Sequence, residues 1–410
     1  MRKFLDRDKT NLNNHLLSII WLLFFIMPNN YVFYIFVPIS YIILVNKKNV
    51  TYNISRVIIY LVISLVFTLV INVGKDYIVL EEYARIITIM IFLFSFTKIK
   101  GTKILKIYIY FAIFFLFFTQ LSTLFNLSSI TNLIKSYYSS ETVIKKMQIY
   151  ESVQINDFGT VRLGGIYFNS NQYARYLELV LITFLCEVNT FRKKEFYIII
   201  PIIVFSIIAT GSRTGLIVLF LIFLYYIYLK TNYRKRAIMI ILISLLFGIL
   251  FLFINGFIGH FRVFQIREGL DNSLSIKIDL LNSYLTQNHD LFTLLFGNLS
   301  NEVLTTKYHS YFAGTDFDIG NIIVRYGFVF FFLFIGLCYS LLKKTLPKYK
   351  LLYTILFWMF SSSIICNYRT APIFFLMIGI YYRRSLIESN MCFNHNDMKP
   401  KLSVQEEIKL

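Results

Sequence analysis

IYIYFAIFFLFFTQLSTLFNLSSITNLI, residues 107–134, is the stretch that decides the fold, because it contains no charged side chain. A helix needs roughly 20 apolar residues to cross a bilayer, so this run is long enough to span one. Ala237–Gly259 and Leu351–Tyr368 are also uncharged. One soluble domain could not bury several such helices on all sides, whereas the interior of a bilayer accommodates them. The sequence therefore predicts a protein that crosses a membrane repeatedly.

The overall composition agrees with this interpretation and narrows the class of protein. Hydrophobic residues make up 57% of the 410 residues and charged residues only 15%, where a soluble domain carries about 25% charge. The net charge of +19 does not indicate nucleic-acid binding, because the basic residues sit in short clusters between apolar runs, as topology signals do. The four cysteines have no metal-ligand spacing, so we expect neither a disulfide framework nor a metal site.

The apolar runs predict an all-α, polytopic integral membrane protein with about twelve transmembrane helices. The predicted helices are Leu16–Met27, Tyr31–Val45, Ile54–Val73, Tyr83–Phe96, Ile104–Phe125, Asn171–Val188, Phe196–Ala209, Thr214–Leu229, Ala237–Asn255, Ile319–Leu342, Leu351–Cys366 and Ala371–Leu386. They form a single membrane domain over residues 1–390, followed by a cytoplasmic polar tail at 391–410.

The orientation follows from lysine and arginine, which gather in alternate connecting segments such as Lys47/Lys48, Arg192–Lys194 and Lys343/Lys344. Basic loops stay in the cytoplasm, so we expect a multi-pass protein of the cytoplasmic (inner) membrane with both termini cytoplasmic. This orientation puts two long loops outside, at about 126–170 and about 256–318, the larger between helices nine and ten. Within the larger loop, Leu274–Leu285 has apolar residues at helical spacing, which predicts a short surface helix.

A second set of arginines lies near the outer ends of helices that start outside. It comprises Arg85, Arg175, Arg213, Arg325 and Arg369. Helix starts and guanidinium groups both bind phosphate, so the set suggests an outward site for a lipid phosphate or diphosphate. Two simpler accounts stay open: a plain capping turn from which Arg213 snorkels to the headgroups, and a pair between Arg175 and Glu178 on one helix.

Asp316-Phe317-Asp318 matches the carboxylate pair that binds metal in many nucleotide-sugar transferases. The predicted outer location disfavours nucleotide chemistry, and the chain has no phosphate-binding glycine loop. We therefore expect no metal or other cofactor, and the simpler account of these carboxylates is a cap on helix ten.

Three motifs together resemble O-antigen polymerases and O-antigen ligases. Arg162–Ala174 (RLGGIYFNSNQYA) resembles a segment of that family that leads into a helix, and Thr210–Gly215 (TGSRTG) is similar to its Ser-Arg-x-Gly helix start. Tyr308–Ser310 (YHS), followed by Asp318, Gly320 and Tyr326-Gly327, resembles the histidine-containing end of the family's large loop, with Ser310 where asparagine is usual. The motifs come in the family's order and cover roughly half of the chain.

The resemblance implies an enzyme, a polysaccharide polymerase that makes capsular, O-antigen or exopolysaccharide from undecaprenyl-diphosphate-linked repeat units without metal or nucleotide. A leaving diphosphate needs positive charge, for which Arg213 is the first candidate and Arg162 the second. The attacking hydroxyl needs a base, for which His309 is the first candidate; Asp316 and Asp318 are alternatives for orienting His309 or for acting as the base themselves. Residues predicted to bind substrate are Arg162, Arg262, Arg267, Asn169, Asn171, Ser212, Asp316 and Asp318.

Two alternatives use the same sequence features. A ligase would move a finished glycan to another acceptor, and a flippase or other transporter would move lipid-linked oligosaccharide without making a bond. The predicted partners are the lipid-linked glycan donor and acceptor and the lipid bilayer, with no nucleic acid; the resemblance adds a separate chain-length regulator protein. Long outer loops and charges gathered at one surface favour the enzyme over the transporter.

Overall fold

The computed structural model describes part of the chain, most of it helical. The described residues are 52–72, 103–124, 170–187, 191–230, 281–282, 284–286, 290–298, 318–360, 364, 374–375, 377–382, 384–386 and 388. They are helices with short turns and include no strand, which confirms the all-α prediction for this part of the chain. Four predicted helices lie outside the described residues: Leu16–Met27, Tyr31–Val45, Tyr83–Phe96 and Ala237–Asn255.

The observed helices begin and end close to the predicted positions. They are α3 (Tyr52–Ile71), α5 (Lys103–Leu124), α8 (Ser170–Cys186), α9 (Lys193–Ala209), α10 (Arg213–Lys230), the short α13 (Leu291–Phe296), α16 (Asp318–Lys344) and the 3-10 helix η3 (Pro347–Phe360). In the predicted surface helix Leu274–Leu285, the described residues 281–282 and 284–285 are helical. The predicted helix Ala371–Leu386 is helical at its described positions as well.

The segment predicted as Leu351–Cys366 differs most from expectation. It begins earlier, at Pro347, which suits the first turn of a helix because proline lacks the amide hydrogen that would go unpaired there. It ends earlier, at Phe360, and is wound as a 3-10 helix of 14 residues. A 3-10 helix rises about 2.0 Å per residue, so these residues cover about 28 Å, a distance that an α-helix of this length would not reach.

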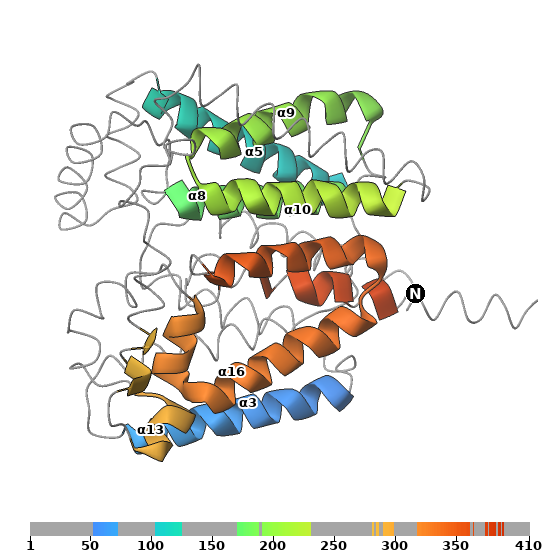
Figure 1. The fold of residues 1–410 in the computed structure, drawn as a ribbon. Coiled ribbons are helices and arrows are strands. Elements are labelled where there is room, and N and C mark those ends of the chain that lie inside the picture. Colours follow the sequence, from blue (N-terminus) through green and yellow to red (C-terminus); the bar gives the residue numbers. More distant parts are fainter. Residues whose placement is uncertain are drawn as a thin grey trace, which may run out of the picture.

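The helices form two groups joined by η3 (Figure 1). α8 packs against α5, α9 and α10 in one group, and α16 packs against α3 and α13 in the other. η3 contacts α8 and α10 on one side and α16 on the other, so it is the element through which the two groups meet. Its side chains Leu352, Ile355 and Trp358 are fully buried and belong to the hydrophobic core.

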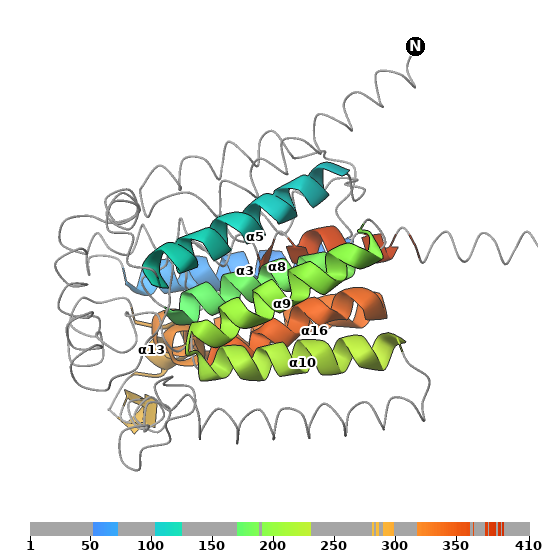
Figure 2. The ribbon, with the colours of Figure 1, turned by 90° about the horizontal axis from the view of Figure 1, so that it is seen from above.

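The two ends of the bundle differ in charge. At one end, which we call the basic end, α5 and α9 begin with lysine, α10 ends with lysine, and α16 ends with a lysine pair. At the other end, which we call the opposite end, α8, α10 and α16 begin and α3, α9 and η3 finish; α13 also lies there, as Figure 2 shows. The basic clusters recognised in the sequence thus gather on one side of the described bundle.

One described helix, α16, is long and apolar enough to cross a membrane, with 27 residues. Shorter apolar helices are present at Ile59–Ile71, Ile109–Ser122 and Arg213–Leu229. α3 also exposes apolar side chains one turn apart on one face, with Ile63 at 44%, Val66 at 50% and Val70 at 63% exposure, as a lipid-facing helix does. The number of crossings, the large outer loop and the side of each terminus stay predictions.

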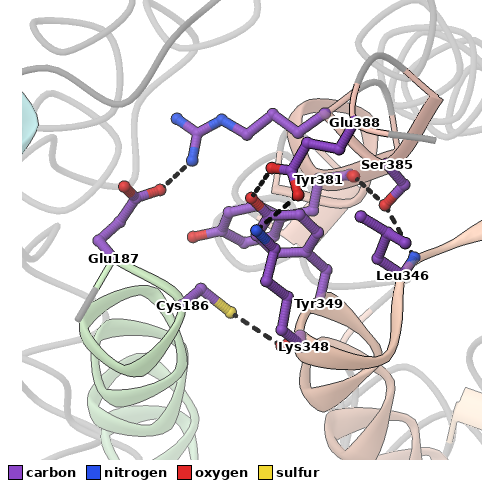
Figure 3. Close-up of polar contacts among 9 residues, drawn as sticks. Cys186, Glu187, Leu346, Lys348, Tyr349, Tyr381, Ser385 and Glu388 are labelled. Carbon is purple, nitrogen blue, oxygen red and sulfur yellow. Dashed lines mark hydrogen bonds and ion pairs between the residues drawn. The ribbon is translucent and has the colours of Figure 1, made fainter. Parts of the chain in front are cut away.

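The basic end is closed by paired charges. Arg384 forms an ion pair with Glu187 just beyond α8, and both side chains are largely buried. Lys348 lies 2.6 Å from Glu388, and the Tyr349 hydroxyl donates to the same carboxylate at 2.9 Å (Figure 3). Burial alone would lower the pKa of Lys348, but its contacts with Glu388 and Tyr349 outweigh this and raise the pKa above its ordinary value. These pairs hold three separate segments together.

Uncharged side chains also connect segments at the basic end. The Tyr349 ring stacks on Tyr381 with centroids 4.8 Å apart. The Ser385 hydroxyl accepts from the Leu346 amide at 2.9 Å and donates to the Tyr381 carbonyl at 2.7 Å (Figure 3). The turn between α16 and η3 is therefore fixed to the last described helical segment.

Candidate functional site

The starts of α8 and α10 meet at a close approach between Gly215 and Ala174. A Cβ atom placed on Gly215 would lie 3.0 Å from the Ala174 Cβ, a contact so tight that a larger residue would have to push the two helices apart by a few tenths of an ångström. Ser212 and Arg213 lie in the turn before Gly215, and Asn171 lies one turn before Ala174. The contact therefore brings three of the predicted site residues to the same part of the opposite end.

The turn before α10 is built from its own side chains. Gly211 has a φ of 65°, a left-handed conformation that glycine adopts without strain. The Ser212 amide donates to the Thr210 hydroxyl at 3.2 Å, and the Ser212 hydroxyl accepts from the Gly215 amide at 3.1 Å. Ser212 thus caps α10, which confirms the capping account for this residue. Its contact with substrate stays a prediction.

Three arginines at the opposite end differ in how deeply they are buried. Arg213 is the first residue of α10 and is partly exposed. Arg175 is 0% exposed and Arg325 is 6% exposed. Arg175 comes five residues after the start of α8 and Arg325 seven after the start of α16, which places them about 8 and about 10 Å along their helices. Buried arginines at such depths are costly and usually functional in membrane proteins.

Arg175 is held in the core by η3 and not at a surface. Its guanidinium carbon lies 5.4 Å from the centroid of the Trp358 ring, and its Nε donates to the Asn171 carbonyl at 3.2 Å. Trp358 also donates its indole N–H to the carboxylate of Glu178, which is fully buried. The sequence suggested a pairing of Arg175 with Glu178 on one helix; the structure adds Trp358, which contacts both and joins α8 to η3.

Asp318 begins α16 and is fully buried. Its carboxylate accepts from the backbone amide of Ile364 at 2.5 Å. The sequence favoured a cap on helix ten for Asp318; its position in the first turn suits the helix dipole, but the hydrogen bond reaches across to the segment that follows η3. Asp318 at the start of α16 therefore holds the segment that follows η3 in place.

Residues 290–298 of the predicted large loop pack tightly on α16 at two glycines. Gly297 and Gly327 have φ values of 87° and 78°, and each would clash if it carried a Cβ. On Gly297 the Cβ would lie 2.1 Å from the Arg325 carbonyl, and on Gly327 it would lie 2.2 Å from the Leu295 carbonyl. The Asn298 amide donates to the Val324 carbonyl at 2.8 Å. Gly327 therefore kinks α16 where α13 crosses it.

This crossing also includes α3. The Asn72 side-chain amide donates to the Gly297 carbonyl at 3.3 Å, and Phe67 stacks on Phe296 with centroids 5.3 Å apart. The sequence analysis included Gly327 in the third motif but missed its packing role, and it missed Gly297 entirely. The signal that could have found this role of Gly327 was a glycine interrupting the apolar pattern of a helix, which often marks close backbone packing.

The structure places only some of the predicted site residues. Arg213, Ser212 and Asn171 lie at the junction of α8 and α10, and Asp318 lies across η3 on α16. Six predicted site residues lie outside the described residues: His309, Arg162, Arg262, Arg267, Asn169 and Asp316. Arg85 and Arg369 lie outside them as well. In the described part, no group of three or more histidine, cysteine, aspartate or glutamate side chains is arranged to hold a metal ion.

Comparisons with known proteins add no relative. No model of a known protein family matches the chain, and no curated protein matches it. The resemblance to O-antigen polymerases and ligases therefore rests on the motifs Arg162–Ala174, Thr210–Gly215 and Tyr308–Ser310 alone.

Proposed function

We propose that this chain is a glycosyltransferase of the cytoplasmic membrane that polymerises undecaprenyl-diphosphate-linked oligosaccharide repeat units at the outer face. In the reaction, a hydroxyl of the acceptor glycan attacks the anomeric carbon of the donor. The bond from that carbon to the diphosphate oxygen breaks, and the undecaprenyl diphosphate leaves with the electron pair. The hydroxyl proton passes to a base, for which His309 is the candidate.

The observation that carries the proposal is the position of Arg213. It is partly exposed at the start of α10, at the end of the bundle away from the basic clusters. A guanidinium beside a helix start suits a multiply charged anion, because the fork and the helix dipole both stabilise it. Negative charge grows on the diphosphate as it leaves, so a positive group fixed at that point lowers the barrier.

The tightly packed surroundings of Arg213 also favour this role. Ser212 caps the helix and Gly215 packs on Ala174, so the backbone that carries Arg213 is fixed before substrate arrives. A charge held in place needs no rearrangement when the leaving group develops its own charge. Residues of the proposed binding set, Arg162, Arg262 and Arg267, would contribute further positive charge from the loops.

A strain that lacks the protein tests the proposal through the lipid-linked intermediate that it accumulates. Accumulation of single repeat units on undecaprenyl diphosphate at the outer face supports a polymerase. Accumulation of long lipid-linked chains would instead indicate a ligase, and single units trapped on the cytoplasmic face would indicate a flippase. The last two results would overturn the proposal, and each names the activity that replaces it.

A further inference from the structure

The first two turns of α16 carry three polar side chains on one face. Asp318, Asn321 and Arg325 are spaced by three and four residues, which aligns them along one side of an α-helix. All three are buried, with exposures of 0%, 1% and 6%. The face that they form begins at the opposite end of the bundle, where Arg213 starts the neighbouring group of helices.

Asn321 differs from its neighbours on this face. Asp318 is fixed by the Ile364 amide, but neither Oδ1 nor Nδ2 of Asn321 has a hydrogen-bond partner in the structure of the described residues. A buried amide without partners costs free energy, and native proteins contain few such groups. No contact among the described residues explains a polar side chain here, since a leucine, which has the same branched shape, would avoid the cost.

We infer that Asn321 is a binding residue for the sugar part of the lipid-linked substrate; this inference rests on the proposed function. The amide has one donor group and one acceptor group, so it can bond adjacent hydroxyls, each of which also donates and accepts. A diphosphate only accepts hydrogen bonds and would leave the amide oxygen unpaired. Asn321 therefore suits the glycan, while the arginines suit the diphosphate.

The neighbours of Asn321 support the same assignment. A sugar in this position would lie between a carboxylate and a guanidinium, Asp318 and Arg325, one turn away on either side. The crossing of α13 at Gly327 and the bond from Asp318 to Ile364 fix both ends of this helical stretch. The amide is covered in this structure, so the sugar reaches it when the segments packed on this face move apart.

The test compares Asn321→Leu with a matched control, Ser64→Ala. Ser64, on α3, is also buried with a hydroxyl that has no partner among the described residues, but it lies outside the polar face. Each purified protein is placed in phosphatidylglycerol vesicles and supplied with lipid-linked repeat units isolated from the strain that lacks the protein. KM, kcat and the unfolding temperature Tm are measured. Asn321→Ala is carried alongside as a second variant in case the leucine prevents insertion.

Loss of two hydrogen bonds to bound sugar should raise KM roughly tenfold to a hundredfold in Asn321→Leu, with kcat within about twofold of wild type. Its Tm should be unchanged or higher, because an unpaired buried amide has been removed. Ser64→Ala should keep KM and kcat.

Wild-type KM in both Asn321 variants would overturn the inference. So would a lower Tm and kcat with unchanged KM, because that pattern indicates a structural role. If the wild-type protein itself makes no polymer from the isolated units, the proposed function fails and the inference fails with it. Failure of the inference alone is recognised by an active wild type whose Asn321 variants match it.

Discussion

At the basic end of the bundle, charged side chains find partners within the protein. Lys348 lies 2.6 Å from Glu388, and Arg384 pairs with Glu187. At the opposite end, the polar side chains of α16 are less exposed than these pairs. The amide of Asn321 nevertheless has no hydrogen-bond partner among the described residues. Both ends belong to one bundle and share its core helices, so the difference does not follow from fold class.

We interpret the difference as separating groups that stabilise the protein from a group proposed to bind substrate, Asn321. Most polar side chains that only hold a fold are satisfied by one another, because an unpaired group lowers stability; the Ser64 hydroxyl on α3 is an exception among the described residues. Departures from this rule collect at functional sites, where substrate supplies the missing partners. Variants at the opposite end should therefore change activity or the shape of the site, whereas variants at the basic end should change stability alone.

The largest effect is expected from Arg213→Ala. If Arg213 faces the leaving diphosphate as proposed, its removal should lower kcat roughly a hundredfold to a thousandfold. Arg213→Lys should recover part of the activity, because it keeps the charge but loses the two-pronged fork. Polymer length on gels and insertion by immunoblot give the measurement, with Lys344→Ala at the basic end as the control. Full-length polymer from a normally inserted Arg213→Ala protein would contradict the catalytic role proposed for the opposite end.

Gly327→Ala should have the next largest effect, through the backbone. The new Cβ would lie 2.2 Å from the Leu295 carbonyl at a φ of 78°, so α13 must separate from α16, at a cost of about 3 kcal/mol or more. Gly336→Ala is a matched control on the same helix, because a Cβ there meets nothing within 4 Å. It should be neutral or stabilise by up to about 1 kcal/mol. Equal Tm values for Gly327→Ala and Gly336→Ala would contradict the close packing of α13 on α16 at Gly327.

Glu187→Ala tests the buried pair of the basic end. It leaves the largely buried Arg384 without its carboxylate, and removal of one partner of a fully buried pair costs about 3–5 kcal/mol. Because the pair is still 12% and 7% exposed, we expect a smaller loss of about 2 kcal/mol in chemical unfolding. Specific activity of the folded protein should stay at the wild-type value. A raised KM would show that the basic end takes part in catalysis.

Sequence reasoning located the helices because long uncharged runs leave few alternatives. It also recognised the capping turn at Ser212, since its signal lies within a few residues of the helix that it caps. It missed the contact of Arg175 with Trp358 and the crossing at Gly297 and Gly327, which join residues distant in sequence. Local pattern carries no information on such pairs. Asn321 gave no signal at all, because a single polar residue in an apolar helix is common.

Glu388→Ala should have the smallest effect and completes the comparison within the basic end. Lys348 and Glu388 are 51% and 36% exposed, and such pairs contribute less than about 1 kcal/mol because water and salt screen them. The raised pKa of Lys348 means that this small contribution persists at neutral pH and is lost only as the pH rises above about 10. The contribution of the Lys348–Glu388 pair is measured as the difference in free energy of unfolding between wild type and Glu388→Ala, at pH 7 and at high pH, with and without added salt. If Glu388→Ala lost as much stability as Glu187→Ala, the number of partners of each carboxylate, and not its burial, would determine its contribution to the stability of the basic end.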